Sequence, residues 1–193
     1  MQITLMRHGK PVLDRTGWIS PREMAGWITR YDTSEVEQHG VPAPCVDAAR
    51  TAMVVIVSTA SRAASSAHAL GRDDFLVDAL FCEAQLPFPN WRFPYLPAQA
   101  WALLFRIGWL FGYARGTESV HECRQRARQA ALRLAALAAQ QPILLMGHGV
   151  MNELIAKELL TMGWQGPPKT TGRYWDFSQY QKCGDGPVYT SDM

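Results

Sequence analysis

Uninterrupted apolar runs of strand length constrain the fold of this chain more than any other feature. The run at 53–58 is almost entirely β-branched, and a second run at 141–146 is equally apolar. Such runs are typical of strands that are covered on both faces in a parallel sheet. A shorter alternating run, 2–6, opens the chain. We therefore expect an α/β fold, a single-domain three-layer α/β/α sandwich with a mainly parallel central sheet, and we expect 53–58 to be its central strand.

Helical signals separate these runs. Ser20 and Glu23 have capping-box spacing around Pro21, which predicts a helix from there to about Tyr31. An Ala/Ser-rich helix is expected to end near Gly71, and a long helix should run from about Thr117 to just before Pro142. The remaining expected elements are helical turns at 46–52, a strand at 75–80, a helix at 150–162 and an edge strand within 173–181.

The segment between the fourth strand and the long helix has an unusual composition. Four prolines alternate with aromatic residues at 87–97, which predicts an ordered loop that forms a lid or pocket wall. The following stretch, 98–113, is apolar nearly all round, so a helix buried on most sides is expected, with an oligomer interface as the alternative. We expect one domain over 1–193, with an insert at about 84–116.

Composition excludes several classes of protein. The net charge of +2 over 193 residues provides no general attraction to nucleic acid or to a membrane. The arginines at 124–133 lack interleaved aromatic residues, and no apolar run reaches the roughly 20 residues of a membrane span. The chain shows no secretory signal, and its four cysteines have no metal-ligand spacing, so we expect reduced thiols in a cytoplasmic protein. The oligomeric state is left open.

Cationic side chains follow three of the predicted strands. Arg7 and His8 come directly after the run at 2–6, Arg62 lies in the first turn of the helix after 53–58, and His148 follows 141–146. Glu83 comes shortly after a fourth strand. Ligands of α/β sheets collect at the carboxyl ends of the strands, where guanidinium forks bind phosphoryl groups and imidazoles supply a nucleophile and a donor. The pattern predicts a phosphoryl-transfer site, whereas His39, His68 and His121 are interpreted as structural.

Four segments together resemble a known family. Leu5-Met6-Arg7-His8-Gly9 is similar to an Arg-His-Gly signature, 58–67 is similar to a Ser-x-x-x-Arg-Ala segment, Glu83 occupies the position of an acid, and 146–149 is similar to a second histidine motif. On these segments the chain resembles the histidine phosphatase superfamily, with its phosphoglycerate-mutase-like fold. The resemblance spans residues 2 to about 160 in the correct order.

The resemblance implies a mechanism. His8 attacks phosphorus and forms a phosphohistidine, while Arg7, Arg62 and His148 hold the non-bridging oxygens. Glu83 acts as the general acid and then the general base, and Glu118 is the alternative acid. No metal and no cofactor are expected. The substrate-binding residues are expected to be Arg7, Arg62, His148, Gly9, Gly149 and Trp91.

The sequence departs from the family after the first motif. Many relatives have Glu-Thr there, whereas this chain has Lys10 and Pro11, so hydrolysis of a phosphomonoester is favoured over mutase-type phosphotransfer. Removal of phosphate from protein phosphohistidine is an alternative within the enzyme class. A non-catalytic module that binds a phosphate ligand is an alternative outside it. The expected partner is a small phosphorylated molecule whose identity the sequence does not give.

Overall fold

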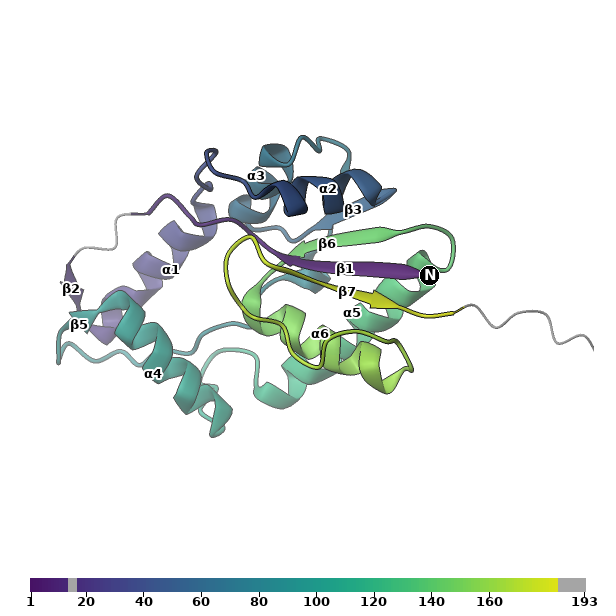
Figure 1. Cartoon of the computed structure of the whole chain (residues 1–193). Coiled ribbons are helices and arrows are strands. Elements are labelled where there is room, and N and C mark those ends of the chain that lie inside the picture. Colours follow the sequence, from purple (N-terminus) through teal and green to yellow (C-terminus); the bar gives the residue numbers. More distant parts are fainter. Residues whose placement is uncertain (14–16, 184–193) are drawn as a thin grey trace, which may run out of the picture.

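The computed structural model describes residues 1–13 and 17–183, and a five-stranded sheet lies at its centre (Figure 1). The strand order is β4-β3-β6-β1-β7, with β1, β3, β4 and β6 parallel and β7 antiparallel to β1. The strands are β1 (Gln2–Arg7), β3 (Val54–Val57), β4 (Phe75–Val77), β6 (Ile143–Gly147) and β7 (Phe177–Gln181). The mainly parallel sheet is confirmed, and β7 is the expected edge strand.

The expectation that 53–58 forms the central strand was wrong. The central strand is β6, and β3 lies between β6 and the short edge strand β4. Both strands are buried on their two faces. A run of apolar residues therefore predicts burial, but it does not predict which strands lie on either side. The fourth strand is also shorter than expected. It ends at Val77, and a short 3₁₀ helix, η2 (Ala79–Phe81), follows it.

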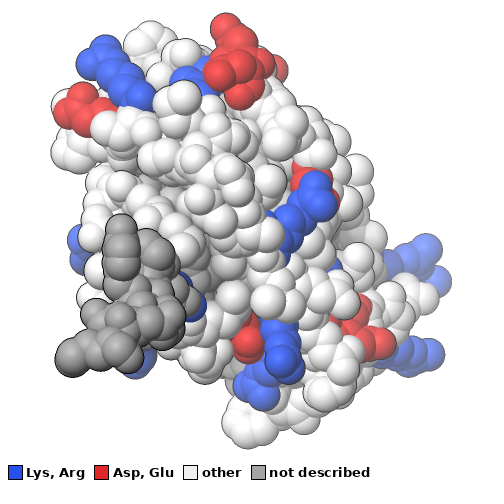
Figure 2. Space-filling view, turned by 90° about the vertical axis from the view of Figure 1, so that its right-hand side faces the viewer, with Lys and Arg blue, Asp and Glu red and all other residues white. Residues whose placement is uncertain are grey.

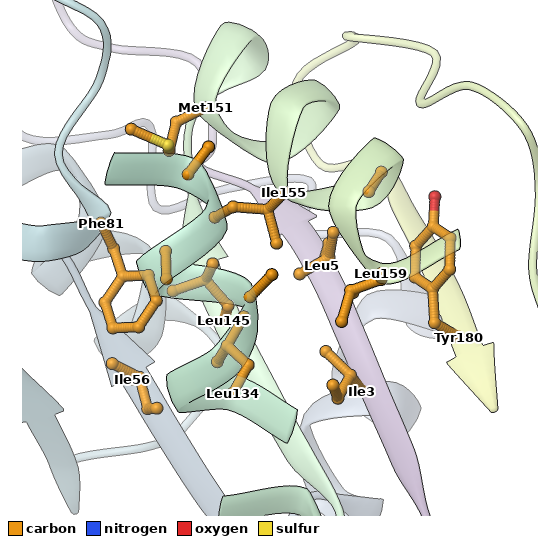
Figure 3. Packing of buried hydrophobic residues seen from close by; sticks show 14 of the residues in the cluster. Ile3, Leu5, Ile56, Phe81, Leu134, Leu145, Met151, Ile155, Leu159 and Tyr180 are labelled. Carbon is orange, nitrogen blue, oxygen red and sulfur yellow. The ribbon is translucent and has the colours of Figure 1, made fainter. Parts of the chain in front are cut away.

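Helices cover both faces of the sheet. Side chains of one face, Leu5 and Leu145 among them, pack against α5 (Val120–Ala138) and α6 (Gly149–Thr161), as Figure 3 shows. Side chains of the other face, including Met6, pack against α2 (Ala43–Thr51) and α3 (Ser61–Ala69). Because successive residues of a strand point to opposite faces, the run in β1 serves both layers. This arrangement is the expected three-layer sandwich.

The expected capping boxes are present. The Ser119 backbone N–H donates to the Glu122 carboxylate at 2.8 Å, and the Glu122 N–H donates to Ser119 Oγ at 3.2 Å, where α5 begins. At the earlier site, the Glu23 carboxylate accepts from the Ser20 backbone N–H at 2.8 Å. The chain there forms a 3₁₀ turn, η1 (Pro21–Glu23), which leads into α1 (Met24–Thr33). These bonds satisfy N–H groups that a helix cannot pair internally.

A peripheral unit stands beside the sandwich. A two-residue strand β2 (Trp18–Ile19) pairs with β5 (Leu96–Pro97), and α4 (Ala98–Leu110) follows β5 and packs against α1 (Figure 1). The prediction that this helix is buried on most sides was wrong. One face is buried, and the opposite face, which is equally apolar, is exposed. The sequence shows that apolar residues lie on all sides of this helix, but it does not show how many of those sides pack against other elements.

Surface charge follows the near-neutral composition. Figure 2 shows Lys and Arg interspersed with Asp and Glu on the face at which β1 begins, and no broad patch of one sign lies there. Within the part of the chain that the structure describes, no helix has the length and apolar character needed to span a membrane. The sequence also predicts a loop at 10–17, and residues 14–16 of it lie outside the described residues.

Candidate active site

Three parallel strands end at one edge of the sheet and bring the predicted residues together. Arg7 ends β1 and His8 follows it, Arg62 is the second residue of α3 after β3, and His148 lies between β6 and α6. The His8 and His148 ring centroids are 5.2 Å apart. The exposed fractions of His8, Arg62 and His148 are 2%, 3% and 0%. Two imidazoles and a guanidinium are thus buried together.

The hydrogen bonds of His8 assign its tautomer. Its Nδ1 lies 2.7 Å from the Gly9 carbonyl oxygen, which can only accept, so Nδ1 carries the proton. Arg62 Nε lies 3.2 Å from His8 Nε2 and can only donate, so the lone pair of Nε2 faces the guanidinium. His8 is therefore held as a neutral imidazole with Nε2 unprotonated. This nitrogen has the form that a nucleophile requires.

His148 has the opposite tautomer. Arg62 Nη2 lies 3.3 Å from His148 Nδ1, which must therefore accept, and His148 Nε2 lies 2.7 Å from Ser58 Oγ. The proton is on Nε2 and is donated to the Ser58 hydroxyl. Ser58 also accepts from the Ala60 N–H at 3.3 Å. The serine that opens the 58–67 motif thus holds the second histidine in a fixed orientation.

Burial and neighbouring charge keep both histidines neutral. Desolvation lowers the pKa of His8 well below 6.5, and His148 and Arg62 lower it further. Desolvation, followed by Arg62 and Arg7, lowers the pKa of His148 well below 6.5. A low-dielectric site that already holds two guanidinium groups disfavours a further positive charge. A negatively charged ligand would instead favour the protonated imidazoles.

Arg62 connects the site to α1. Its Nη1 donates to Asp32 Oδ1 at 2.6 Å and to the Tyr31 carbonyl oxygen at 3.2 Å. The Arg62 Cζ lies 4.5 Å from the centroid of the Tyr31 ring. Burial raises the pKa of Tyr31 to about 12. Each nitrogen of this guanidinium has a protein partner, and the carboxylate of Asp32 occupies one edge of it.

The segment 170–176 covers Arg7. Arg7 Nη1 donates to the Gly172 carbonyl oxygen, and the Arg7 Cζ lies 4.3 Å from the Tyr174 ring centroid. The same ring lies 5.5 Å from the His8 ring. His8, Arg62 and His148 are all buried. Together with the cover over Arg7, this burial makes the described structure a closed form of the site.

The two predicted glycines lie beside different side chains of the site, Trp175 and Arg7. A Cβ on Gly9 would clash with the Trp175 ring, so no larger residue fits without movement. The Gly9 N–H donates to Ser66 Oγ at 2.8 Å, which joins the end of β1 to α3. A Cβ on Gly149 would lie 3.6 Å from the Arg7 Cζ, an ordinary contact that places this residue beside the guanidinium.

The two candidate acids lie in different environments. The Glu83 carboxylate accepts from the N–H groups of Val150 and Met151 at 3.2 and 3.0 Å, so it lies at the start of α6 directly after His148. Glu118 instead forms a bidentate ion pair with Arg126, with both N–O distances at 2.7 Å. This geometry favours Glu83 as the candidate acid, because the carboxylate of Glu118 is already paired with Arg126.

Several site residues were missed from the sequence. Asp32, Tyr31 and Tyr174 contact the two arginines, and no local pattern marks them, because they reach the site only when α1 and the chain before β7 have packed. Ser58 and Ser66 lie in the 58–67 motif, whose spacing could have identified them. Trp91 is exposed, and its backbone carbonyl accepts from the Arg22 N–H at 3.1 Å, so its proposed contact with a substrate stays a prediction.

No group of three or more His, Cys, Asp or Glu among the described residues is arranged to hold a metal ion. No curated protein matches the chain. Similar solved structures include a mycobacterial glucosyl-3-phosphoglycerate phosphatase, with 20% identity, a TM-score of 0.58 and coverage of 92% of this chain and 88% of that chain. A phosphoserine phosphatase mutant from Entamoeba histolytica has 17% identity, a TM-score of 0.57 and coverage of 98% and 95%. At such identities the likeness shows the fold.

The family model of the histidine phosphatase superfamily (branch 1) matches residues 47–189. The matched part contains Arg62, Glu83 and His148, and the structure adds Arg7 and His8 to them from the strand that precedes it. The expected fold and the expected kind of enzyme, a phosphatase, are thereby confirmed. The chain belongs to the histidine phosphatase superfamily.

Proposed function

We propose that this chain is a metal-independent phosphatase that hydrolyses a phosphomonoester through a phosphohistidine on His8. The observation that carries the proposal is the neutral tautomer of His8, whose Nε2 lone pair lies 3.2 Å from Arg62 Nε in a buried site. A nucleophile must be unprotonated, and a phosphoryl group must lie beside it within reach of cationic donors. His8 and Arg62 meet both requirements.

In the first step, His8 Nε2 attacks phosphorus and the bond between phosphorus and the ester oxygen breaks. Arg7, Arg62 and His148 hold the three non-bridging oxygens as the charge on them develops. The phosphoryl dianion favours protonation of His148, because an opposite charge raises the pKa of an imidazole. For the phosphoryl group to bind, it must displace Asp32 from Arg62 and the Gly172 carbonyl from Arg7. Arg62 must also turn its N–H groups from His8 Nε2 and His148 Nδ1 to the phosphoryl oxygens, which frees Nε2 for the attack. Arginine side chains supply the positive charge that a metal supplies in other phosphatases.

Glu83 is proposed to transfer the protons. It donates a proton to the leaving oxygen, and then it takes a proton from the water that attacks phosphorus and breaks the N–P bond. Its position at the N-terminus of α6, immediately after His148, supports this assignment. Glu118 remains the alternative acid, although its ion pair with Arg126 favours a structural role.

The substrate is proposed to be a small phosphorylated molecule. Lys10 and Pro11 follow the first motif where many relatives have Glu-Thr, which favours hydrolysis over phosphotransfer. Two of the structural neighbours are a glucosyl-3-phosphoglycerate phosphatase and a phosphoserine phosphatase, and the substrates in these names are small phosphomonoesters. The insert at about 84–116, including Trp91, is proposed to form a wall against which the organic part of the substrate lies.

The test measures turnover of p-nitrophenyl phosphate in the presence of EDTA, with a search for a phosphoenzyme. Wild type should turn over and should form an acid-labile, base-stable adduct, whereas His8→Ala should do neither. His68→Ala is the matched control, because His68 is an exposed histidine that pairs with Asp73. Turnover by His8→Ala at the wild-type rate would exclude the proposal.

The same proteins test the two alternatives. Tight binding of phosphate by wild type with no turnover of any phosphomonoester would make the chain a binding module. Glu83→Gln distinguishes phosphohistidine hydrolysis, since a phosphoramidate leaves without help from an acid. Equal loss on both substrate classes is expected if Glu83 also activates water. Activity of Glu83→Gln retained on phosphoramidate alone would favour the phosphohistidine phosphatase.

A further inference from the structure

We infer that the outer face of α4 is the contact surface between two copies of this chain. The outer face consists of Leu103, Leu104, Ile107, Leu110 and the C-cap residue Phe111, whose exposed fractions range from 43% to 89%. These positions have the spacing i, i+1, i+4, i+7 and i+8, so they share one side of the helix. Trp101, Phe105 and Trp109 form the opposite, buried side. The inference does not depend on the proposed function.

The exposed apolar area is large enough for a dimer. Three further exposed aromatic residues lie in or just before the β2–β5 pair, where α4 begins: Trp18, Phe93 and Tyr95. With side chains of about 150–250 Å² each for the aromatic residues, this set leaves on the order of 1,000 Å² of apolar surface in water. The largest patch on a typical monomer covers about 300–600 Å². A standard interface needs about 800 Å² from each partner.

The composition of the segment is that of a protein interface. Residues 84–117 contain nine aromatic residues and three arginines, and they contain no Lys, Asp or Glu. The cores of interfaces are enriched in aromatic residues and Arg and depleted of Lys, Asp and Glu. Arg106 does not interrupt the outer face, because its Nη2 donates to the Ala84 carbonyl at 2.8 Å and its Cζ lies 4.8 Å from the Trp109 ring centroid. The centre of the face is therefore free of charge.

A second copy fits this face better than an unrelated helix does. A two-fold contact needs a self-complementary patch, and an aliphatic helix face with no charge at its centre is self-complementary. Two such helices can approach to 8–10 Å with their Leu and Ile side chains interdigitated. In an antiparallel pair the N-terminal end of each helix lies beside the C-terminal end of the other, where the helix dipoles attract. The arginines before and after α4, Arg92 and Arg115, then lie at the solvated rim.

Sedimentation velocity of the purified full-length chain over a range of concentrations tests the inference. Wild type should show a reversible dimer, and the triple variant Leu103→Ser/Leu110→Ser/Phe111→Ser should raise the dimer Kd at least ~100-fold. Leu132→Ser is the matched control, because Leu132 is an exposed leucine on α5 and its substitution should leave the Kd unchanged. Thermal unfolding of the triple variant below its Kd should match that of wild-type monomer, which shows that the fold is intact.

Three outcomes would overturn the inference. Wild type could sediment as a monomer at every concentration, or the triple variant could dimerise as tightly as wild type. In the third, monomeric wild type would bind vesicles of phosphatidylcholine and phosphatidylglycerol and the triple variant would not. That result would assign the outer face to lipid instead of a second copy.

Discussion

The two most distinctive regions of the molecule reverse the usual distribution of polar and apolar groups. At the carboxyl edge of the sheet, Arg62 and two histidines are buried, and each is held by protein partners. On α4, five large apolar side chains lie in water on the outer face. Burying charge and exposing apolar surface both cost free energy. The proposed occupants, a phosphoryl group in one region and a second copy in the other, would recover part of that cost.

The regions differ in how they are prepared for binding. The site is closed, since Asp32 and the Gly172 carbonyl already accept hydrogen bonds from the two arginines. A ligand there exchanges one set of polar partners for another. Among the described residues, nothing covers the outer face of α4, so an occupant there displaces only water. Substitutions in the site should therefore change affinity and rate in either direction, while substitutions on the outer face should change association alone.

The largest expected effect is a difference in stability between substitutions on the two sides of α4. Phe105 is 7% exposed and stacks on Trp101, whereas Phe111 is 89% exposed. Phe105→Ala should lower the free energy of unfolding by about 3–5 kcal/mol, because it leaves a cavity between α4 and α1. Phe111→Ala should change it by less than about 0.5 kcal/mol in dilute protein. Urea unfolding at a concentration that holds the chain monomeric measures both.

An equal loss of unfolding free energy in Phe105→Ala and Phe111→Ala would contradict the difference between the two sides of α4. In that case the outer face would be packed against another part of the chain in solution. The dilute condition matters, because dimerisation would add stability to wild type by mass action and would make Phe111→Ala look destabilising.

Arg62→Met should give the next largest effect, on rate rather than on stability. The guanidinium donates to both histidines, so its removal takes away a preorganised donor and releases the lone pair of His8 Nε2. The loss in kcat/KM for p-nitrophenyl phosphate should be about 10²–10³-fold, or about 3–4 kcal/mol. Arg124→Met on the exposed side of α5 is the matched control. A decrease below tenfold would mean that Arg62 holds the fold and does not bind the phosphoryl group.

Lowering the pH should decrease the free energy of unfolding, by less per pH unit than the effects of the substitutions above. In the native chain the pKa values of His8 and His148 lie well below 6.5, and unfolding restores their ordinary value. The unfolded chain therefore takes up protons below about pH 6.5 that the folded chain does not, and stability falls as pH falls. Each histidine contributes at most about 1.4 kcal/mol per pH unit.

Urea unfolding of wild type and His148→Gln at several pH values between about 7.5 and 5.5 isolates this contribution. The variant should lose up to half of the histidine-dependent slope. His121→Gln, an exposed histidine on α5, should have the wild-type slope. Identical slopes for His148→Gln and wild type would show that His148 is protonated in the folded chain.

The sequence was sufficient to predict where the candidate site lies, but not which residues cover its arginines. Arg7, His8, Arg62 and His148 each follow a strand directly, and parallel strands of one sheet end at one edge, so their meeting could be predicted. Asp32 and Tyr174 are brought to the arginines by the packing of α1 and by the return of the chain before β7. Such contacts depend on long-range packing, which leaves no local pattern in the sequence.

The same limit explains the errors in the fold. The runs in β3 and β6 are both buried, and only their pairing partners distinguish the central strand from its neighbour. In α4 the apolar residues at 101, 105 and 109 pack inside, while those at 103, 107 and 110 face water. An interface between chains has the composition of a core, so a single sequence does not separate them.

Tyr174→Ala should lower the free-energy cost of opening the site by about 1 kcal/mol. The ring lies over the Arg7 guanidinium, and a cation–π contact of this kind contributes about 0.5–2 kcal/mol that a substrate must overcome. The KM for p-nitrophenyl phosphate should fall by about fivefold with little change in kcat. Tyr113→Ala, beyond the end of α4, is the control. A higher KM would instead show that the Tyr174 ring contacts the bound substrate.

The smallest expected effect comes from Asp32, and its sign identifies what the carboxylate does. Its side chain is 52% exposed, so its ion pair with Arg62 contributes at most about 1 kcal/mol. If the carboxylate competes with phosphate for Arg62 Nη1, Asp32→Asn should tighten inhibition by inorganic phosphate by up to about fivefold. The amide keeps the shape of the side chain and can still accept one hydrogen bond, whereas its lost charge weakens the competition. Asp73→Asn, at the exposed pair with His68, is the control. Weaker inhibition in Asp32→Asn would mean that the carboxylate orients Arg62 toward the phosphoryl group, so that the closed form is also the form that binds phosphate.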